Sequence, residues 1–158
     1  MIEFVLVVPV FLTLAFGLTE YSHLEQNRSV IVNAARDGVR YATLKATAWD
    51  GTAIPASDTI QGEILSEGAT VSVANTNTDV AIKYYTSNAP TFTTTTQCGH
   101  YRIGTGYVAD NGLTQAQCTA AGQLVAVTVS HRFYFTSPLQ LTLPGGVVVG
   151  ATEWGTVP

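Results

Sequence analysis

The residue whose type and position could do chemistry most directly is Glu3, an acid inside the apolar amino-terminal run MIEFVLVVPVFLTLAFGL. A carboxylate in apolar surroundings is costly unless a positive group pairs with it. One interpretation is an assembly segment: its helix is first anchored in a membrane and then packs inside a filament, where Glu3 pairs with a terminal amine. The other is a signal anchor with one acid near the lipid headgroups. These residues alone favour neither.

The apolar run covers about 17 residues, positions 2–18, at the short end of the length that spans a bilayer. No Lys or Arg precedes Arg28, so a cleavable signal peptide, which begins with basic residues, fits poorly. Pro9 removes one backbone hydrogen bond in the middle of the run and predicts a kink or local loosening of a helix there.

Cys98 and Cys118 are the only cysteines, and they flank a stretch rich in glycine and turn residues. If this part of the chain lies outside the cytoplasm, as an anchoring helix implies, a disulfide is favoured over free thiols. A bridge across a loop of this length stabilises a fold by about 3 kcal/mol in the chain-entropy model. Two widely spaced cysteines with His100 nearby do not match the ligand spacing of a metal site.

The sequence offers little other chemistry. It contains no P-loop, nucleophile elbow, paired metal-binding histidines or CxxC. Positions 75–79 lack the charge and spacing of a calcium loop, and His131 is expected at the edge of the core. We therefore predict no catalytic residue, metal or cofactor, and no enzyme activity. A net charge of −4 without a basic patch argues against nucleic acid as a partner.

The element that must position Glu3 is one long helix over residues 2–47. Apolar and small residues recur at helical spacing beyond the apolar run, and no proline intervenes before Pro55. The helix would be about 70 Å long at 1.5 Å per residue, so it must protrude from a domain of this size. Small side chains in its second half permit close packing; the candidate packing residues are Ala35, Gly38 and Ala42.

Most of the rest of the chain is predicted to form strands. The clearest covers 123–135, with Val125, Val127 and Val129 on one face. Weaker candidates are 69–74, 79–85, 101–108 and 147–154. A tight turn is expected at 143–146, and a short helix at 59–65 within the connection 51–66. We predict an α+β fold in which a long amino-terminal helix, residues 1–48, packs on a small antiparallel sheet within a β-rich domain, residues 49–158.

Both ends of the chain carry a family resemblance. The distal stretch LVAVTVSHRFYFTSPLQL is similar to a late strand leading into an aromatic-proline turn. The amino-terminal features are an acid–phenylalanine pair, an early proline, a second acid after a glycine and a small-residue and arginine patch: Glu3-Phe4, Pro9, Gly17 with Glu20, and Ala34, Ala35, Arg36, Gly38 and Arg40. In these features the chain resembles the TadE-like proteins of tight-adherence (Flp-type) pilus systems, within the class related to type IV pilins.

The resemblance implies a structural pilin or pseudopilin. Such a chain polymerises through its amino-terminal helix into an extracellular filament, with Glu3, Phe4 and Pro9 as assembly and register residues. Implied partners are copies of itself, a prepilin peptidase and an inner-membrane assembly platform; the chain would lie in the inner membrane before assembly and at the cell surface afterwards. Two alternatives stay open: a minor pilin that starts or caps a filament, and a membrane-anchored binding domain with aromatic contacts from Tyr101, Tyr107 and Trp154.

One feature departs from the family pattern. The processing peptidase of such systems cuts after a glycine and leaves the acid at the fifth mature position, whereas here the acid is third. Either two further residues precede Met1 in the natural chain, which is the alternative we expect, or the chain is processed differently.

Overall fold

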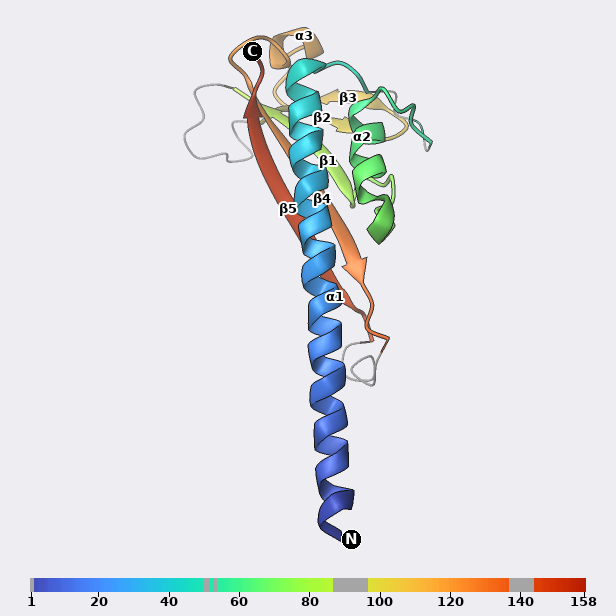
Figure 1. Ribbon diagram of the computed structural model, residues 1–158. Helices are drawn as coiled ribbons and strands as arrows, with labels where there is room; N and C mark the ends of the chain where they lie inside the picture. Colours follow the sequence, from blue (N-terminus) through green and yellow to red (C-terminus); the bar gives the residue numbers. More distant parts are fainter. Residues whose placement is uncertain (1, 50–51, 53, 87–96, 137–143) are drawn as a thin grey trace.

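Helix α1 (Ile2–Leu44) dominates the computed structural model, which describes all residues except 1, 50–51, 53, 87–96 and 137–143 (Figure 1). Its 43 residues form one helix about 65 Å long at 1.5 Å per residue. Pro9 lies inside the helix, which continues past it. The first half of α1 protrudes from the rest of the molecule, and the second half lies along it (Figure 1). The predicted long helix is confirmed.

The helix ends at Leu44, short of the predicted residue 47. Residues of the folded domain bind the backbone carbonyl groups that follow. The carbonyl of Ala46 accepts hydrogen bonds from the hydroxyl groups of Tyr84 and Tyr101, at 2.9 and 3.1 Å. The carbonyl of Ala48 accepts one from the N–H of Ile60. Backbone carbonyls need such partners when they leave a helix, and these bonds hold the chain in a turn.

The sheet has five strands in the order β3-β2-β1-β4-β5, and every neighbouring pair is antiparallel. The sequence therefore folds as predicted, into the α+β class with a long amino-terminal helix on an antiparallel sheet. The strands are β1 (Val80–Tyr85), β2 (Gln97–Arg102), β3 (Gly106–Ala109), β4 (Leu124–Phe133) and β5 (Val147–Thr156).

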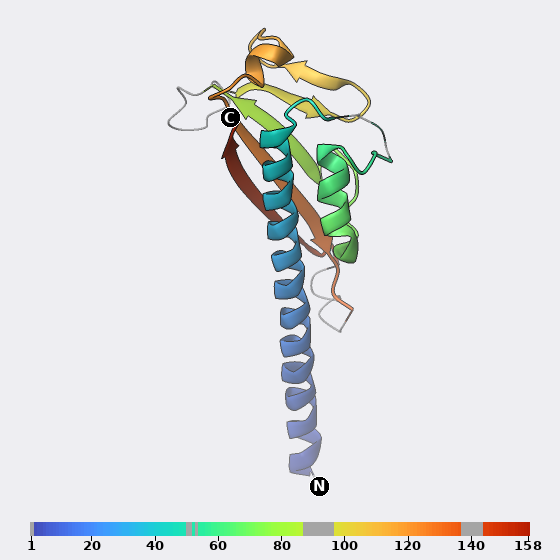
Figure 2. The ribbon, with the colours of Figure 1, turned by 45° about the horizontal axis from the view of Figure 1, so that its top comes forward.

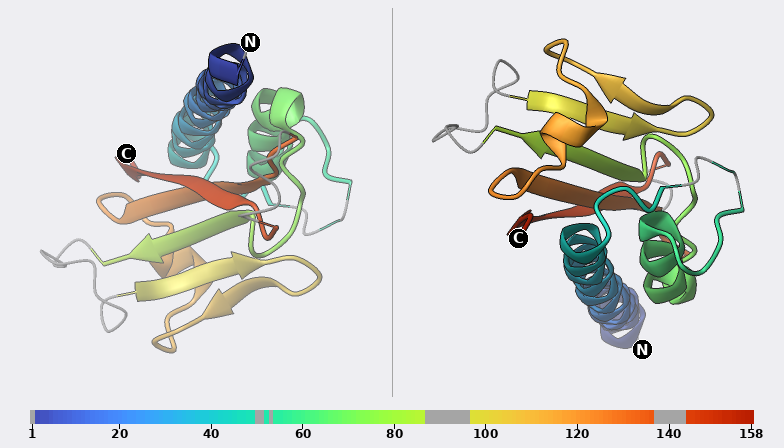
Figure 3. Two further views of the ribbon diagram at one scale, coloured as in Figure 1. Left: turned by 90° about the horizontal axis from the view of Figure 1, so that it is seen from below. Right: turned by 90° about the horizontal axis from the view of Figure 1, so that it is seen from above.

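Helix α2 (Ile60–Glu67) lies beside α1 on the same face of the sheet (Figures 2 and 3). Its start is capped by Thr59, whose hydroxyl accepts a hydrogen bond from the N–H of Gly62 at 3.1 Å. The core lies between these helices and β1 and β4. Its fully buried side chains include those of Ile31, Ile60, Ile64, Ile82, Tyr84, Val125, Val127 and Val129.

Two glycines let these layers approach closely. A Cβ added at Gly38 of α1 would lie 2.5 Å from Cγ1 of Ile64 on α2, and one added at Gly155 of β5 would lie 2.5 Å from Cγ1 of Val39. The neighbouring stripe residues Ala35 and Ala42 are fully buried. Small residues at these positions therefore set the distance between α1 and both of its neighbours.

The predicted strand at 69–74 is wrong. Gly68–Val71 form a short 3-10 helix, η1, and Ser72 follows in the left-handed region with φ of 56°. Val71 and Val73 are both buried. The alternating apolar pattern arises because both valines point into the core from either side of a turn, and not because they share the face of a strand.

The predicted single strand at 101–108 is also wrong, because it contains a hairpin. β2 ends at Arg102 and β3 begins at Gly106, which pairs with Arg102. Gly104 and Gly106 have φ of 81° and 79°, values that favour glycine. The other predicted strands are present, as is the short helix. Pro144 and Gly145 form a turn before β5, while position 143 of the predicted turn lies outside the described residues.

Replacing Gly38 by Ala is expected to lower the thermal unfolding midpoint of the full chain in detergent micelles. Alanine gains about 0.5–1 kcal/mol over glycine in a helix, but overpacking a filled core costs about 1–3 kcal/mol. Gly17→Ala is the matched control in the same helix, since nothing lies within 4 Å of a Cβ added there. A Gly38→Ala variant as stable as the parent would contradict this account of the close approach.

Candidate functional site

The first half of α1 presents large apolar side chains to its surroundings. Phe4 is 74% exposed and Leu18 is 71% exposed, although both are hydrophobic. The exposed large apolar residues between and including them are Phe4, Val7, Val10, Phe11, Leu12, Leu14, Phe16 and Leu18. Contiguous apolar surface of this kind marks a site that meets a membrane or another protein.

Polar groups within this apolar segment are satisfied by the helix itself. The hydroxyl of Thr13 donates to the carbonyl of Pro9, at 2.8 Å, and that of Thr19 donates to the carbonyls of Ala15 and Phe16, at 3.1 and 2.9 Å. Internal pairing of this kind suits a helix whose surroundings contain no water. The one sign of these bonds in the sequence is that Thr13 follows Pro9 at helical spacing.

Of the helices that the structure describes, α1 is the one long and apolar enough to cross a membrane, by length and composition. The predicted register residues lie near its start. Glu3 belongs to the first turn of α1, Phe4 follows it with its ring exposed, and Pro9 is exposed one to two turns further on. The structure describes the place of Glu3 in the helix but not its side chain.

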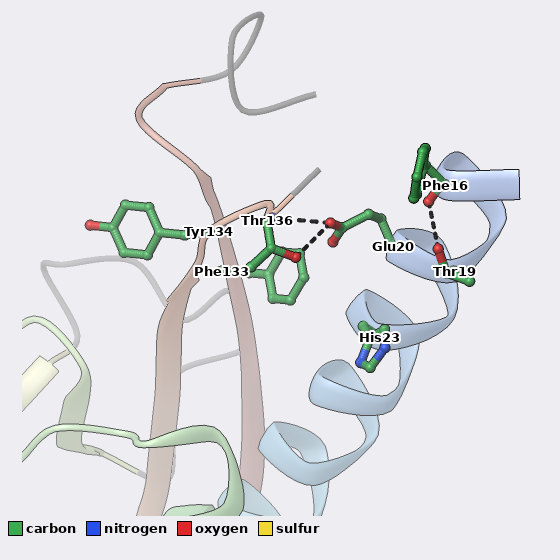
Figure 4. Close-up of a pocket in the computed structure, with 7 residues that line it drawn as sticks. All are labelled: Phe16, Thr19, Glu20, His23, Phe133, Tyr134 and Thr136. Atoms are coloured by element: carbon green, nitrogen blue, oxygen red, sulfur yellow. Dashed lines mark hydrogen bonds between the residues drawn. The ribbon is translucent and has the colours of Figure 1, made fainter. Parts of the chain in front are cut away.

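Glu20 marks the end of the exposed segment, and it is buried, with only 7% of its surface accessible. Its Oε1 accepts hydrogen bonds from both the backbone N–H and the hydroxyl of Thr136, each at 3.0 Å. Thr136 lies three residues beyond β4. Figure 4 shows the Glu20 carboxylate pointing across to Thr136, so this acid fastens the chain after β4 to the helix.

A cleft of about 370 Å³ lies at this junction between α1 and the end of β4. Residues of both polar and aromatic character line it: Phe16, Thr19, Glu20, His23, Phe133, Tyr134 and Thr136. In Figure 4, the His23 ring lies on the next turn of the helix after Glu20, and the Tyr134 ring points away from the helix. The cleft is therefore lined by carboxylate, imidazole and aromatic groups.

The small-residue and arginine patch of α1 is divided between the core and the surface. Ala34, Ala35 and Gly38 are buried against the sheet and α2, as is Ala42 one turn later. Arg36 is exposed and its Nε lies 3.3 Å from Oε1 of Glu153 on β5. A surface pair of this kind contributes about 0–1 kcal/mol, so the buried small residues carry more of the helix–sheet packing.

Cys98 and Cys118 form a disulfide, with their Cα atoms 5.8 Å apart. Cys98 lies on β2, and Cys118 ends the short helix α3 (Gln115–Cys118). The hydroxyl of Tyr107 lies 2.8 Å from Sγ of Cys118 and 3.2 Å from the carbonyl of Leu113. The bridge and this tyrosine together hold the segment after β3 against the edge of the sheet.

Within the same loop, Nδ1 of His100 lies 2.8 Å from Oδ2 of Asp110. Burial opposes ionisation of Asp110, but hydrogen bonds from His100 and Gln97 and the charge of Lys83 outweigh it and hold the pKa of this carboxyl below its usual range. Among the residues that the structure describes, no cluster of three or more His, Cys, Asp or Glu could hold a metal ion. The pair thus serves to fix the loop.

The proposed aromatic contacts do not share one surface. Tyr101 is buried, stacks on Trp49 with ring centroids 5.2 Å apart, and accepts a hydrogen bond from Gln115. Burial raises its pKa to about 12, against the opposing hydrogen bond. Tyr107 is half-buried at the disulfide, and Trp154 of β5 contacts Tyr85. Tyr101 is therefore a core residue, and the three rings do not gather into one binding surface.

Comparison with known proteins finds a similarity over most of α1. Residues 1–40 match the family model of TadE-like proteins. Neither a curated protein nor a solved structure matches the chain significantly. The match confirms the resemblance predicted from Glu3-Phe4, Pro9 and Glu20 for this segment, which is similar to TadE-like proteins.

Reduction of the Cys98–Cys118 bridge is expected to lower the free energy of unfolding by about 3 kcal/mol, because the cross-link restricts the unfolded chain. Urea unfolding with and without reductant, followed by intact mass after alkylation, would measure this. Tyr107→Phe keeps the bridge and removes only a hydroxyl, so it measures the separate share of the tyrosine, about 0.5–1.5 kcal/mol for a hydrogen bond. Equal stability of the oxidised and reduced protein would contradict the assigned role of the bridge.

Proposed function

We propose that this protein is a structural pilin subunit, which polymerises through the apolar half of α1 into an extracellular filament of the Tad-like, type IV-related class. Residues 1–48 would form first the membrane anchor and then the filament core. Residues 49–158 would form the domain at the filament surface. The proposal assigns no catalytic activity to the chain.

The observation that carries this proposal is the exposed apolar segment from Phe4 to Leu18, on a helix that continues into the folded domain. Burying apolar surface stabilises a protein by roughly 25 cal/mol per Å². A segment of this kind is therefore more stable when lipid or another protein covers it. A bilayer covers such a helix all round. A bundle of the same helices does so equally well, and it keeps each attached sheet domain outside.

The same segment is suited to two successive locations of the chain, first the membrane and then the filament. Held in the inner membrane, the helix would be available to a prepilin peptidase and to an assembly platform. Transfer into a filament would exchange lipid for copies of the same helix, and the subunit would move to the cell surface. The internal hydrogen bonds of Thr13 and Thr19 suit both surroundings, because neither supplies water to these hydroxyls.

Glu3 is the proposed assembly residue, with Phe4 and Pro9 next to it in the same segment. In a filament core, an ionised carboxylate needs a cation, and the terminal amine of a neighbouring copy is the group that assembly brings to it. Such a pair would favour one axial register over others, because only one offset places the two charges together.

Replacing Glu3 by Ala is therefore expected to abolish or strongly reduce surface filaments in cells that express the variant as their sole copy. The sheet domain should keep its thermal unfolding midpoint, since Glu3 lies far along α1 from the core. Filaments would be counted by electron microscopy, and the variant protein in the membrane by immunoblotting.

Glu25→Ala is the matched control in the same helix. The Glu25 carboxylate is exposed, and its contact with Arg28, at 3.9 Å, is a surface pair worth about 0–1 kcal/mol. This variant should form filaments at the parent's abundance. Normal filament numbers with Glu3→Ala would remove Glu3 from the proposed mechanism.

A further inference from the structure

Two acids, Glu3 and Glu20, lie at the two ends of the exposed apolar segment of α1 and thus define its length along the helix axis. The helix rises by about 26 Å from Glu3 to Glu20 at 1.5 Å per residue. The hydrocarbon core of a bilayer is about 30 Å thick. A helix with both acids at the headgroups is therefore slightly short, and groups next to the acids must lie at the boundary between headgroups and acyl chains.

The end of β4 lies at the level of Glu20. The two hydrogen bonds from Thr136 to the Glu20 carboxylate fix this level, and Figure 4 shows the chain from Phe133 to Thr136 beside the helix there. Figure 1 shows that the end of β4 is the part of the sheet that points toward the amino-terminal half of α1. Beyond it toward the amino terminus, the described chain consists of α1.

Aromatic side chains gather at this level from two elements. Tyr21 of α1 is exposed directly after Glu20, and Tyr134 is 57% exposed on the segment that Glu20 holds. Phe16 and Phe133 line the cleft between α1 and the end of β4, and the Phe133 and Phe135 rings meet edge to face with centroids 5.3 Å apart. Tyrosine combines an apolar ring with a polar hydroxyl, and it is enriched where hydrocarbon meets water.

We propose that Tyr21, Phe133, Tyr134 and Phe135 form an interfacial collar that rests in the headgroup region of the bilayer while the subunit is anchored in the membrane. The collar sets the depth of the chain and holds the sheet domain against the membrane surface. This inference rests on the membrane stage of the proposed function. It adds to the anchoring helix a second contact, made by the folded domain.

Two of the polar groups next to the collar have hydrogen-bond partners within the chain, which suits a site beside lipid. Glu20 accepts both bonds from Thr136, and Nη1 of Arg132 donates to the carbonyl of Gly145 at 2.7 Å. Burying these groups at a membrane surface therefore leaves fewer unsatisfied donors and acceptors. Phe16 of the exposed apolar segment lines the same cleft as Phe133 and Tyr134, so one bilayer can cover the segment and the collar together.

Fluorescence quenching by brominated lipid tests the collar directly. The full chain is reconstituted into phosphatidylcholine vesicles whose acyl chains are brominated either close to the headgroup or close to the chain end. Tyr134→Trp and Tyr21→Trp introduce indole reporters at exposed collar positions, and Phe11→Trp introduces one in the middle of the exposed segment. The parent chain in the same vesicles gives the background that is subtracted from each variant.

The two native tryptophans lie far from the collar and contribute that background. Trp154 pairs with Ala126 of β4, about 27 Å along the strand from position 134 at 3.4 Å per residue. Trp49 follows the carboxyl end of α1, and Leu44 at that end lies about 36 Å along the helix from Glu20 at 1.5 Å per residue. Bromines in the bilayer should therefore leave the native emission unquenched.

The collar predicts that the emission added by Tyr134→Trp and by Tyr21→Trp is quenched more strongly by bromines near the headgroup than by deep bromines. Phe11→Trp should show the opposite order. If Phe11→Trp is quenched and Tyr134→Trp is not, the helix enters the bilayer without the domain contact, and the collar is overturned while the proposed function stands. If Phe11→Trp is not quenched, the membrane stage and the collar both fall.

Glu20→Ala, added to Tyr134→Trp, tests the role of the acid. Loss of both bonds to Thr136 should free the segment after β4, so quenching of the indole at position 134 should fall. The same change in the Tyr21→Trp background should leave quenching intact, because position 21 is held by the helix itself. Unchanged quenching at position 134 would show that Glu20 does not position the collar.

Discussion

One continuous helix contains two different segments. Its first half is apolar and exposed in the described chain, and its second half is buried against the sheet. Phe4 and Leu18 are largely exposed, whereas Ile31, Ala35 and Ala42 on the same helix are inaccessible to solvent. Because a helix is stiff over this length, the packing of its second half fixes the direction of its first half. The small residues at Gly38 and Gly155 bring helix and sheet together and thus determine how the apolar segment is presented.

Glu20 connects these two halves. A buried carboxylate is tolerated only when it is hydrogen-bonded, and here both bonds come from the chain just past β4. The acid thus ties the end of the sheet to the point where the helix leaves the domain. Such a tie would limit rocking of the domain on its helix, as the proposed membrane and filament stages require.

Much of this fold could be predicted from the sequence, because strong periodic patterns come from burial on one face. The helix period from Ile31 to Ala42 and the alternation of Val125, Val127 and Val129 both correspond to buried side chains. The alternating pattern wrongly predicted a strand at 69–74, because Val71 and Val73 are buried from the two sides of a turn. It also missed the hairpin, whose only sign is the pair Gly104 and Gly106.

The junction could be predicted only in part. The family resemblance includes Glu20, but no local pattern indicates its partner, since Thr136 lies 116 residues away and carries a common polar side chain. Likewise, the sequence offers Tyr101 as a surface aromatic, and its burial follows from contacts with Trp49 and Ala46 that only the tertiary fold brings together. Contacts between residues far apart in the sequence depend on the path of the chain, and they produce no periodic pattern in the sequence.

Electron microscopy of material sheared from the cell surface, with mass spectrometry to identify the subunits, would show whether this chain polymerises. If it is the polymerising pilin, the filaments are built mainly of this 16.8 kDa chain. A chain that stays with the membrane, or that occurs only as a trace in filaments of another subunit, would contradict its role as the polymerising pilin.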